Sequence, residues 1–86
     1  MDFKFAERFR KSYKKLSKDE QKILHRKFDL MGDNPHHPSL RTKKVQETEN
    51  IFECSINMEI RMTRQYEGES ILLRVIGKHD EVLKNP

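Results

Sequence analysis

Apolar residues at helical spacing run through the first part of the chain. Phe5, Phe9, Tyr13 and Leu16 recur every three or four residues, and Lys and Arg occupy the opposite face. This pattern predicts an amphipathic helix of about three turns from Phe5 onward. In front of it, residues 2–5 alternate polar and apolar side chains, which is typical of a short edge strand.

A second helix is expected to begin at Ser17. Residues 17–20, Ser-Lys-Asp-Glu, have the form of a capping box, in which the Ser17 hydroxyl bonds the Glu20 amide and the Glu20 side chain reaches back. The apolar stripe of this helix consists of Ile23, Leu24, Phe28 and Met31. Residues 32–35, Gly-Asp-Asn-Pro, should end it. Because so few residues separate the two helices, they are expected to form an antiparallel hairpin.

The second half of the chain changes to patterns that are typical of strands. We expect four, over residues 40–46, 51–56, 60–66 and 70–77. The last is the most apolar, so it should lie inside the sheet, and short loops join the last three into an antiparallel meander. The predicted fold class is therefore α+β: a single domain over residues 1–86, with an N-terminal helical hairpin packed on a twisted, four-stranded, mainly antiparallel sheet.

Strand alternation also predicts what lies on the far side of that sheet. If Ile60 and Met62 face the helices, then Arg61 between them faces away. The other side chains expected on this outer face are Glu53, Ser55, Glu59 and Thr63. The outer face is thus expected to be uncovered and polar, with Arg61 on it.

The charge of the chain points to a kind of partner. Its 86 residues carry a formal net charge of +4, and basic residues are concentrated in residues 4–18 and again at Arg41, Lys43 and Lys44. Such a balance favours anionic partners such as nucleic acid. The alternative is a basic protein whose charge merely keeps it soluble.

Cysteine usage and hydropathy indicate a compartment. Cys54 is the one cysteine, so no internal disulfide can form and a reducing compartment is expected. No apolar run is long enough to cross a membrane or to act as an export signal. We therefore expect a cytoplasmic protein with no membrane partner.

Several segments together resemble the RelE/ParE superfamily of bacterial toxins, particularly its RelE-like and YafQ-like members. They are the helical pair ending at Asn34-Pro35, residues 37–44 (His-Pro-Ser-Leu-Arg-Thr-Lys-Lys), Ile51-Phe52-Glu53, Ile60-Arg61, and residues 76–83 (Ile-Gly-Lys-His-Asp-Glu-Val-Leu). The similarity covers almost the whole chain, and the order and spacing of the segments carry it. The resemblance implies a helical hairpin on a twisted antiparallel sheet.

The resemblance also implies a function. RelE-like members cleave mRNA in the ribosomal A site, ParE-like members inhibit DNA gyrase, and both are neutralised by an antitoxin. The favoured prediction is a toxin of a type II toxin–antitoxin system that cuts mRNA on the ribosome as a metal-independent endoribonuclease without a cofactor. The alternatives are a gyrase inhibitor that is not an enzyme, or a degenerate toxin that only binds its antitoxin.

The implied partners are a cognate antitoxin, the ribosome and mRNA, with operator DNA reached only through the antitoxin. For an antitoxin, Phe3, Phe5 and Phe9 are expected to line an apolar groove beside the first helix.

Candidate catalytic residues follow from the same resemblance. Arg61 stands where the family has a strand arginine that contacts the scissile phosphate, and a guanidinium can pair two phosphate oxygens at once. His79 stands where relatives carry a catalytic histidine or arginine, and imidazole titrates near neutrality. His37, beside His36, resembles a loop histidine of YafQ-like members, and Glu59 lies near their aspartate. The candidates are therefore His79, Arg61, His37 and Glu59.

Further basic side chains are expected to bind the RNA backbone. They are Arg41, Lys43, Lys44, Arg64 and Lys78. The sequence also departs from the family, since lysines on the second strand of RelE correspond to Glu53 and Ser55 here, and its C-terminal aromatic corresponds to Leu83. The histidines and Cys54 fit no standard zinc spacing, and Cys54 should point into the core, so we expect no metal site.

Overall fold

The capping box at Ser17 starts the long helix, as predicted. In the computed structural model, which describes residues 2–86, the Glu20 amide donates to Ser17 Oγ at 3.1 Å and the Ser17 amide donates to Glu20 Oε1 at 2.8 Å. Helix α2 then runs over Lys18–Asp33 and ends before Asn34-Pro35. Leu24 and Met31 from its predicted apolar stripe are fully buried. Local sequence therefore sets both ends of α2 and the face that it buries.

Helix α1 is shorter than predicted. It spans Glu7–Tyr13, about two turns, because Phe5 belongs to strand β1 (Asp2–Phe5). Aromatic side chains join the two helices: the ring centroid of Phe9 lies 6.4 Å from that of Phe28, and the Tyr13 hydroxyl lies 3.0 Å from His25 Nε2. Later residues of α1 meet earlier residues of α2, so the predicted antiparallel hairpin is confirmed.

The sheet has five strands rather than four, and it is mixed. The other strands are β2 (Lys43–Lys44), β3 (Ile51–Ser55), β4 (Ile60–Glu67) and β5 (Ser70–Lys78). Their order is β1-β5-β4-β3-β2, with β1 parallel to β5 and every other pair antiparallel. The predicted meander is present, the apolar β5 lies inside the sheet, and β1 is an edge strand.

The strand predicted over residues 40–46 is largely absent. Pro38–Leu40 forms a short 3-10 helix, η1, and Arg41 follows in the left-handed region with φ 47° and ψ 48°. A left-handed residue turns the chain sharply, so pairing with β3 begins only at Lys43. The end of β3 near Ser55 is therefore paired with β4 on one side but has no strand on its β2 side among the described residues.

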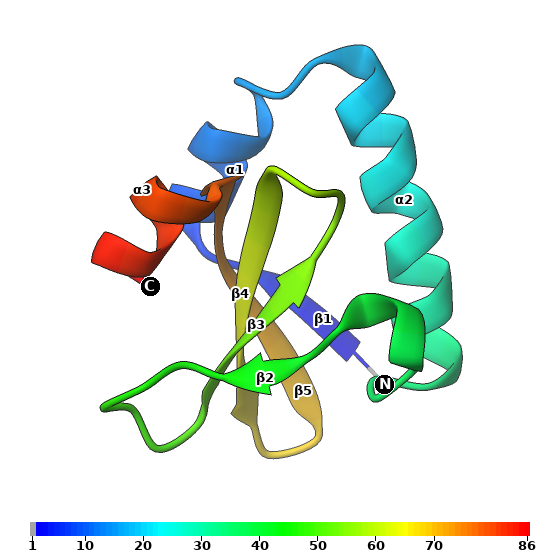
Figure 1. Cartoon of the computed structure of the whole chain (residues 1–86). Coiled ribbons are helices and arrows are strands. Elements are labelled where there is room, and N and C mark those ends of the chain that lie inside the picture. The colour runs from blue at the N-terminus through cyan, green and yellow to red at the C-terminus, as the bar shows by residue number, and fades with distance from the viewer. Residues whose placement is uncertain (1) are drawn as a thin grey trace.

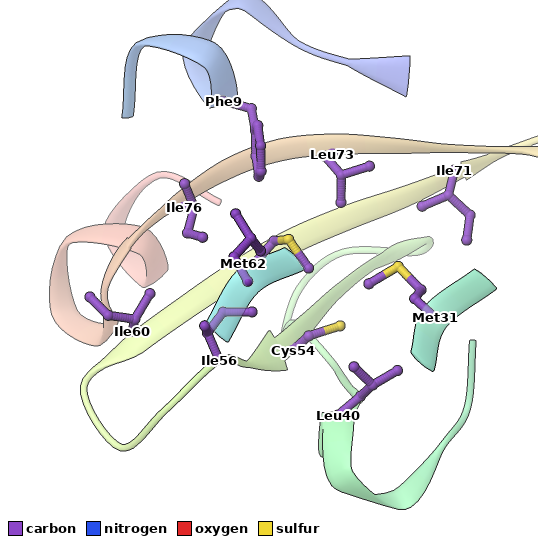
Figure 2. Packing of buried hydrophobic residues seen from close by; sticks show 11 residues of the cluster. Phe9, Met31, Leu40, Cys54, Ile56, Ile60, Met62, Ile71, Leu73 and Ile76 are labelled. Carbon is purple, nitrogen blue, oxygen red and sulfur yellow. The ribbon is translucent and has the colours of Figure 1, made fainter. Parts of the chain in front are cut away.

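The core lies between the sheet and the helical hairpin. Its members are Phe9, Leu24, Met31, Leu40, Cys54, Ile56, Ile60, Met62, Ile71, Leu73 and Ile76, ten of which Figure 2 labels. Burying an apolar side chain of this size stabilises a fold by about 1.5–3 kcal/mol. Cys54 points into this core, as predicted, and burial raises the pKa of its thiol.

A third helix lies on the opposite side of the sheet from α2. Helix α3 (His79–Lys84) begins directly after β5, and Figure 1 shows it across the sheet from α2. No helix within residues 2–86 is long and apolar enough to cross a membrane.

Candidate functional site

The outer face of the sheet carries the polar side chains that alternation predicted there. Glu53 of β3 pairs with Thr63 of β4, and Ser55 pairs with Arg61. These positions alternate with the buried Cys54 and Met62, so they face away from the helical hairpin.

This face is not uncovered, however, and that prediction is wrong. The Thr63 hydroxyl donates to the Pro86 carbonyl at 2.9 Å, and Arg74 Nε donates to the same oxygen at 3.0 Å. Val82 of α3 is buried above Gly77. The segment after β5 therefore folds back over the sheet, and it buries Thr63 completely and leaves Glu53 only 5% exposed.

A groove about 420 Å³ in volume lies between this covering segment and β2. It is lined by Lys43, Lys44, Val45, Gln46, Glu53, His79 and Leu83, and we call it the His79 groove. Lys43 Nζ lies 3.8 Å from Glu53 Oε1, so an exposed ammonium group neutralises a buried carboxylate. Three of the predicted residues, His79, Lys43 and Lys44, thus meet in one groove although 35 positions separate His79 from Lys44.

His79 is held by the start of α3. Its amide donates to the Glu59 carbonyl at 3.0 Å, which extends the β4–β5 pairing by one residue. Its side chain is 45% exposed, and Nδ1 lies 3.2 Å from Asp80 Oδ1. Nε2 makes no hydrogen bond within residues 2–86, so one imidazole nitrogen is free to hydrogen-bond a ligand in the groove.

Arg61 and Arg41 line a second groove, about 430 Å³ in volume, at the neighbouring end of β3. The lining residues are Lys27, Ser39, Arg41, Ser55, Ile56, Asn57, Met58 and Arg61, and we call it the Arg61 groove. The sequence pointed to the two arginines but missed Lys27, which belongs to α2 and reaches the groove only because η1 packs beside that helix. No sequence signal connected Lys27 with Arg61.

Among the described residues 2–86, Glu59 and His37 line neither the His79 groove nor the Arg61 groove. The Glu59 side chain is exposed on the turn before β4, next to His79 through the backbone hydrogen bond. His37 precedes η1, and its Nδ1 accepts from the Ser39 amide at 3.1 Å and contacts the Ser39 hydroxyl at 2.9 Å. His37 therefore acts as a cap for η1 and is not brought together with His79.

Two of the predicted RNA-binding residues lie elsewhere. Arg64 faces the helices and is fully buried, so its expected position on the RNA-binding surface is wrong. Alternation explains this, because Arg64 lies two residues after the buried Met62 on the same strand. Lys78 is exposed and lines a different pocket, between α1 and α3.

An apolar groove of about 590 Å³ runs between the two helices of the hairpin. It is lined by Phe5, Phe9, Arg10, Tyr13, Lys14, His25 and Phe28, and we call it the aromatic groove. Phe5 and Phe9 line it as predicted, whereas Phe3 packs against Phe28, with ring centroids 5.7 Å apart, and is not among its lining residues. Phe5 remains 39% exposed, which is unusual for a large apolar side chain.

Comparisons with known proteins identify the fold. No protein-family model and no curated protein matches the sequence. Among solved structures, YafQ from E. coli strain BL21(DE3) matches with a TM-score of 0.78 at 13% identity over 94% of this chain and 96% of that one. A chain of the RelB–RelE antitoxin–toxin complex from Methanococcus jannaschii matches with a TM-score of 0.79 at 16% identity, over 96% and 99%.

A chain of the E. coli RelBE toxin–antitoxin complex is also similar, with a TM-score of 0.72 at 19% identity over 90% of this chain and 94% of that one. The chain therefore has the fold of the RelE/ParE toxins.

Proposed function

We propose that this chain is the toxin of a toxin–antitoxin pair and that it blocks translation by cutting mRNA on the ribosome. The observation that carries the proposal is the His79 groove, which an imidazole with a free nitrogen lines together with two lysines and a carboxylate. The likeness of the fold to YafQ and RelE and the net charge of +4 support it. Its site of action would be the cytoplasm, where ribosomes are.

The chemistry suits these residues. In cleavage without a metal, the 2′-oxygen attacks the adjacent phosphorus, the bond to the 5′-oxygen breaks, and a 2′,3′-cyclic phosphate and a 5′-hydroxyl result. This needs a base for the 2′-hydroxyl proton, positive charge on the phosphorane and an acid for the leaving oxygen. We assign proton transfer to His79, with Glu53 as the carboxylate partner in the groove, and charge stabilisation to Lys43 and Lys44.

The proposed partner of the free toxin is an antitoxin that covers the aromatic groove. RelE chains with similar folds occur in RelB–RelE complexes. The groove exposes Phe5, and two cations, Arg10 and Lys14, also line it. An amphipathic segment with acidic residues beside its apolar face would fit this chemistry.

One observation favours a second function on the same fold. Glu53 neutralises Lys43 where RelE-like toxins are expected to have lysines, and Leu83 lines the groove where an aromatic side chain is expected. Leucine cannot move a proton and stacks poorly on a base. A toxin that inhibits gyrase, or one that only binds its antitoxin, would tolerate both Glu53 and Leu83 at these positions.

The test is regulated expression of the wild type, His79→Ala and Arg61→Ala, with mapping of transcript 5′ ends. We expect growth arrest with cleavage within translated frames, and a loss of about 10²–10⁴-fold in cleavage for His79→Ala. His36→Ala is the matched control, because His36 is exposed and lines neither groove on the outer face. Circular dichroism of each variant verifies that it is folded.

Three outcomes separate the candidates. Arrest with cleavage that His79→Ala abolishes supports the nuclease. Arrest without cleavage, accompanied by loss of supercoiling activity, supports gyrase as the target. Absence of arrest leaves antitoxin binding as the function and contradicts the nuclease proposal.

A further inference from the structure

The sulfur-containing side chains differ sharply in their exposure to solvent. Within residues 2–86, Met31, Met62 and Cys54 are fully buried, whereas Met58 is 92% exposed. An oxidant dissolved in water therefore reaches the sulfur of Met58 without any opening of the fold. The three buried sulfur atoms become accessible only when the core opens.

The turn between β3 and β4 holds Met58 in solvent. The side-chain oxygen of Asn57 accepts hydrogen bonds from the amides of Glu59 at 2.9 Å and Ile60 at 2.8 Å. Arg61 Nη1 donates to the carbonyls of Asn57 at 2.6 Å and Met58 at 3.1 Å. Because the side chains of Asn57 and Arg61 fix the turn, it does not need the side chain of Met58. A chemical change at this sulfur should leave the fold intact, which is not so for a methionine in a core.

A thioether such as that of Met58 is oxidised by hydroperoxides, including hydrogen peroxide. A sulfur lone pair attacks one oxygen of the peroxide, a sulfur–oxygen bond forms and the oxygen–oxygen bond breaks. The departing oxygen keeps the bonding electrons and takes the proton of the transferred oxygen, so hydrogen peroxide leaves as water. Sulfur is oxidised and the peroxide is reduced. The product is methionine sulfoxide, a polar side chain that methionine sulfoxide reductases convert back to methionine.

The sulfoxide oxygen would appear in the Arg61 groove, which Met58 lines. The groove contains three cations, Lys27, Arg41 and Arg61, and no carboxylate lines it. None of the three forms a salt bridge within residues 2–86. A sulfoxide oxygen carries a partial negative charge, and it is bonded more strongly by a charged donor than by a neutral one. Oxidation therefore places an acceptor beside charged donors that have no carboxylate to bind.

Arg61 is the donor best placed for that oxygen. Its hydrogen bonds within residues 2–86 all come from Nη1, so Nε and Nη2 have no partner there. The contact of Nη1 with the Met58 carbonyl already brings the two residues together across the turn. A methionine side chain has several rotatable bonds and adapts easily to a neighbour. The free edge of the guanidinium is therefore within reach of a sulfoxide on Met58.

We propose that Met58 is a site of reversible oxidation by hydroperoxides, and that its sulfoxide oxygen accepts a hydrogen bond from Nε or Nη2 of Arg61. Oxidation converts an exposed apolar side chain into a polar one that occupies part of the Arg61 groove. Burial protects the other sulfur atoms of residues 2–86, so the modification is confined to this turn. Reduction of the sulfoxide frees Arg61 again. None of this requires the chain to cut RNA.

The first experiment measures where oxygen is added. The folded chain is incubated with hydrogen peroxide, the reaction is stopped with free methionine at several times, and tryptic peptides are analysed by fragmentation mass spectrometry. Cleavage after Arg61 separates Met58 from Met62, and fragment ions separate Met58 from Cys54 on the peptide that they share. The matched control is the same chain in concentrated urea, where burial no longer protects any sulfur atom.

In the folded chain we expect Met58 to gain oxygen about tenfold faster than Met31 and Met62, or more, because the buried residues react only when the core opens. In urea the three rates should converge. Methionine sulfoxide reductases with a thiol reductant should return Met58 to its original mass. Similar rates for the three methionines in the folded chain, or no oxygen on Met58, would overturn the modification site.

The second experiment measures the guanidinium of Arg61 by NMR. The exchange of its Nε and Nη protons with water is compared before and after oxidation, in the wild type and in Met58→Leu, which has no sulfur at this position. In the oxidised wild type, exchange at the bonded nitrogen should slow by about 2–10-fold, the factor for one hydrogen bond of ordinary net strength. Peroxide should not change it in Met58→Leu. Arg26, an exposed arginine of α2 that does not line the groove, serves as the internal reference.

Met58→Gln places a permanent carbonyl oxygen on the turn and should slow the same protons without peroxide. Selective oxidation of Met58 with unchanged exchange at Arg61 would overturn the hydrogen bond and retain the modification site. Equally slowed exchange in peroxide-treated Met58→Leu would assign the effect to another oxidised group and would overturn the contact as well.

Discussion

Arg61 and Arg64 lie three residues apart on β4 and end on opposite faces of the sheet. Arg61 lines the Arg61 groove and is held by turn carbonyls. Arg64 is fully buried beneath the helices, where its Nη2 donates to the Pro35 carbonyl at 2.6 Å and to Thr42 Oγ1 at 3.2 Å. Its Nε and Nη1 have no hydrogen-bond partner within residues 2–86.

The comparison shows that the face of the strand on which an arginine lies decides whether its guanidinium can bind an anion or is buried in the core. On the outer face the guanidinium is available to an anion. On the inner face it lies 5.7 Å from the centre of the Tyr66 ring and faces no carboxylate among the described residues. A fully buried charge of that kind costs stability, whereas the half-buried Arg61 costs less.

The largest expected effect is a difference in the free energy of unfolding between substitutions on the two faces of the sheet. Met62→Ala removes a fully buried side chain from the inner face, and the free energy of unfolding should fall by about 2–5 kcal/mol. Ser55→Ala on the outer face should change it by no more than about 0.5 kcal/mol. Urea denaturation followed by circular dichroism measures both. Comparable losses in the two variants would show that the outer face contributes to folding as much as the core does.

A second prediction is that substitution of the two arginines changes the free energy of unfolding in opposite directions. Arg64→Met replaces a buried charge that lacks a carboxylate with an apolar chain, and the free energy of unfolding should rise by about 1 kcal/mol. Arg61→Met removes the hydrogen bonds to the turn and should lower it by up to about 1 kcal/mol. The same denaturation experiment tests both. A large loss of stability in Arg64→Met would mean that the bonds to Pro35 and Thr42 outweigh the cost of burying the charge.

The smallest expected effect concerns the pH dependence of the inner face. Burial raises the pKa of the Cys54 thiol above its ordinary 9.0, although the Arg64 charge opposes the shift. Stability from the neutral thiol is therefore complete well below pH 9 and is lost as the pH rises through the unfolded pKa toward the folded pKa, because the unfolded thiol ionises first. Relative to Cys54→Val, the wild type should lose roughly 0.4 kcal/mol by pH 9.

Stability curves of the wild type and Cys54→Val between pH 7 and 10 measure this difference. Parallel curves would show that the thiol ionises equally in the folded and unfolded states.

Much of the fold was predictable because it depends on local signals. The capping box at Ser17, the proline after α2 and the alternation of residues 51–56 act over a few positions, and the structure has each feature where the sequence indicates it. Phe5 was counted both in the predicted strand over residues 2–5 and at the start of the predicted helix, since it satisfies both the strand alternation and the helical spacing. Only pairing with β5, far away in the sequence, decides that it belongs to β1.

The site was predictable only in part, because it depends on which segments fold over which. Alternation placed Arg61 on the outer face, but it did not indicate that the segment after β5 folds back so that Pro86 contacts Thr63. The 3-10 turn at η1 removed most of a predicted strand and brought Arg41 beside Lys27. Alternation was sufficient to predict that Arg64 is buried, since the same pattern identified Met62 as a core residue.

The parallel pairing of β1 with β5 also sets an order of events during synthesis. Asp2–Phe5 pairs with residues 70–73, so the first strand made has no place in the sheet until the last strand has left the ribosome. At about 5–20 residues per second, that delay lasts several seconds. Closing the long loop between β1 and β5 is slow relative to forming the β3–β4 hairpin. A nascent chain therefore carries Phe3 and Phe5 unpaired until β5 has emerged, and those are the seconds in which a chaperone or a partner would meet them first.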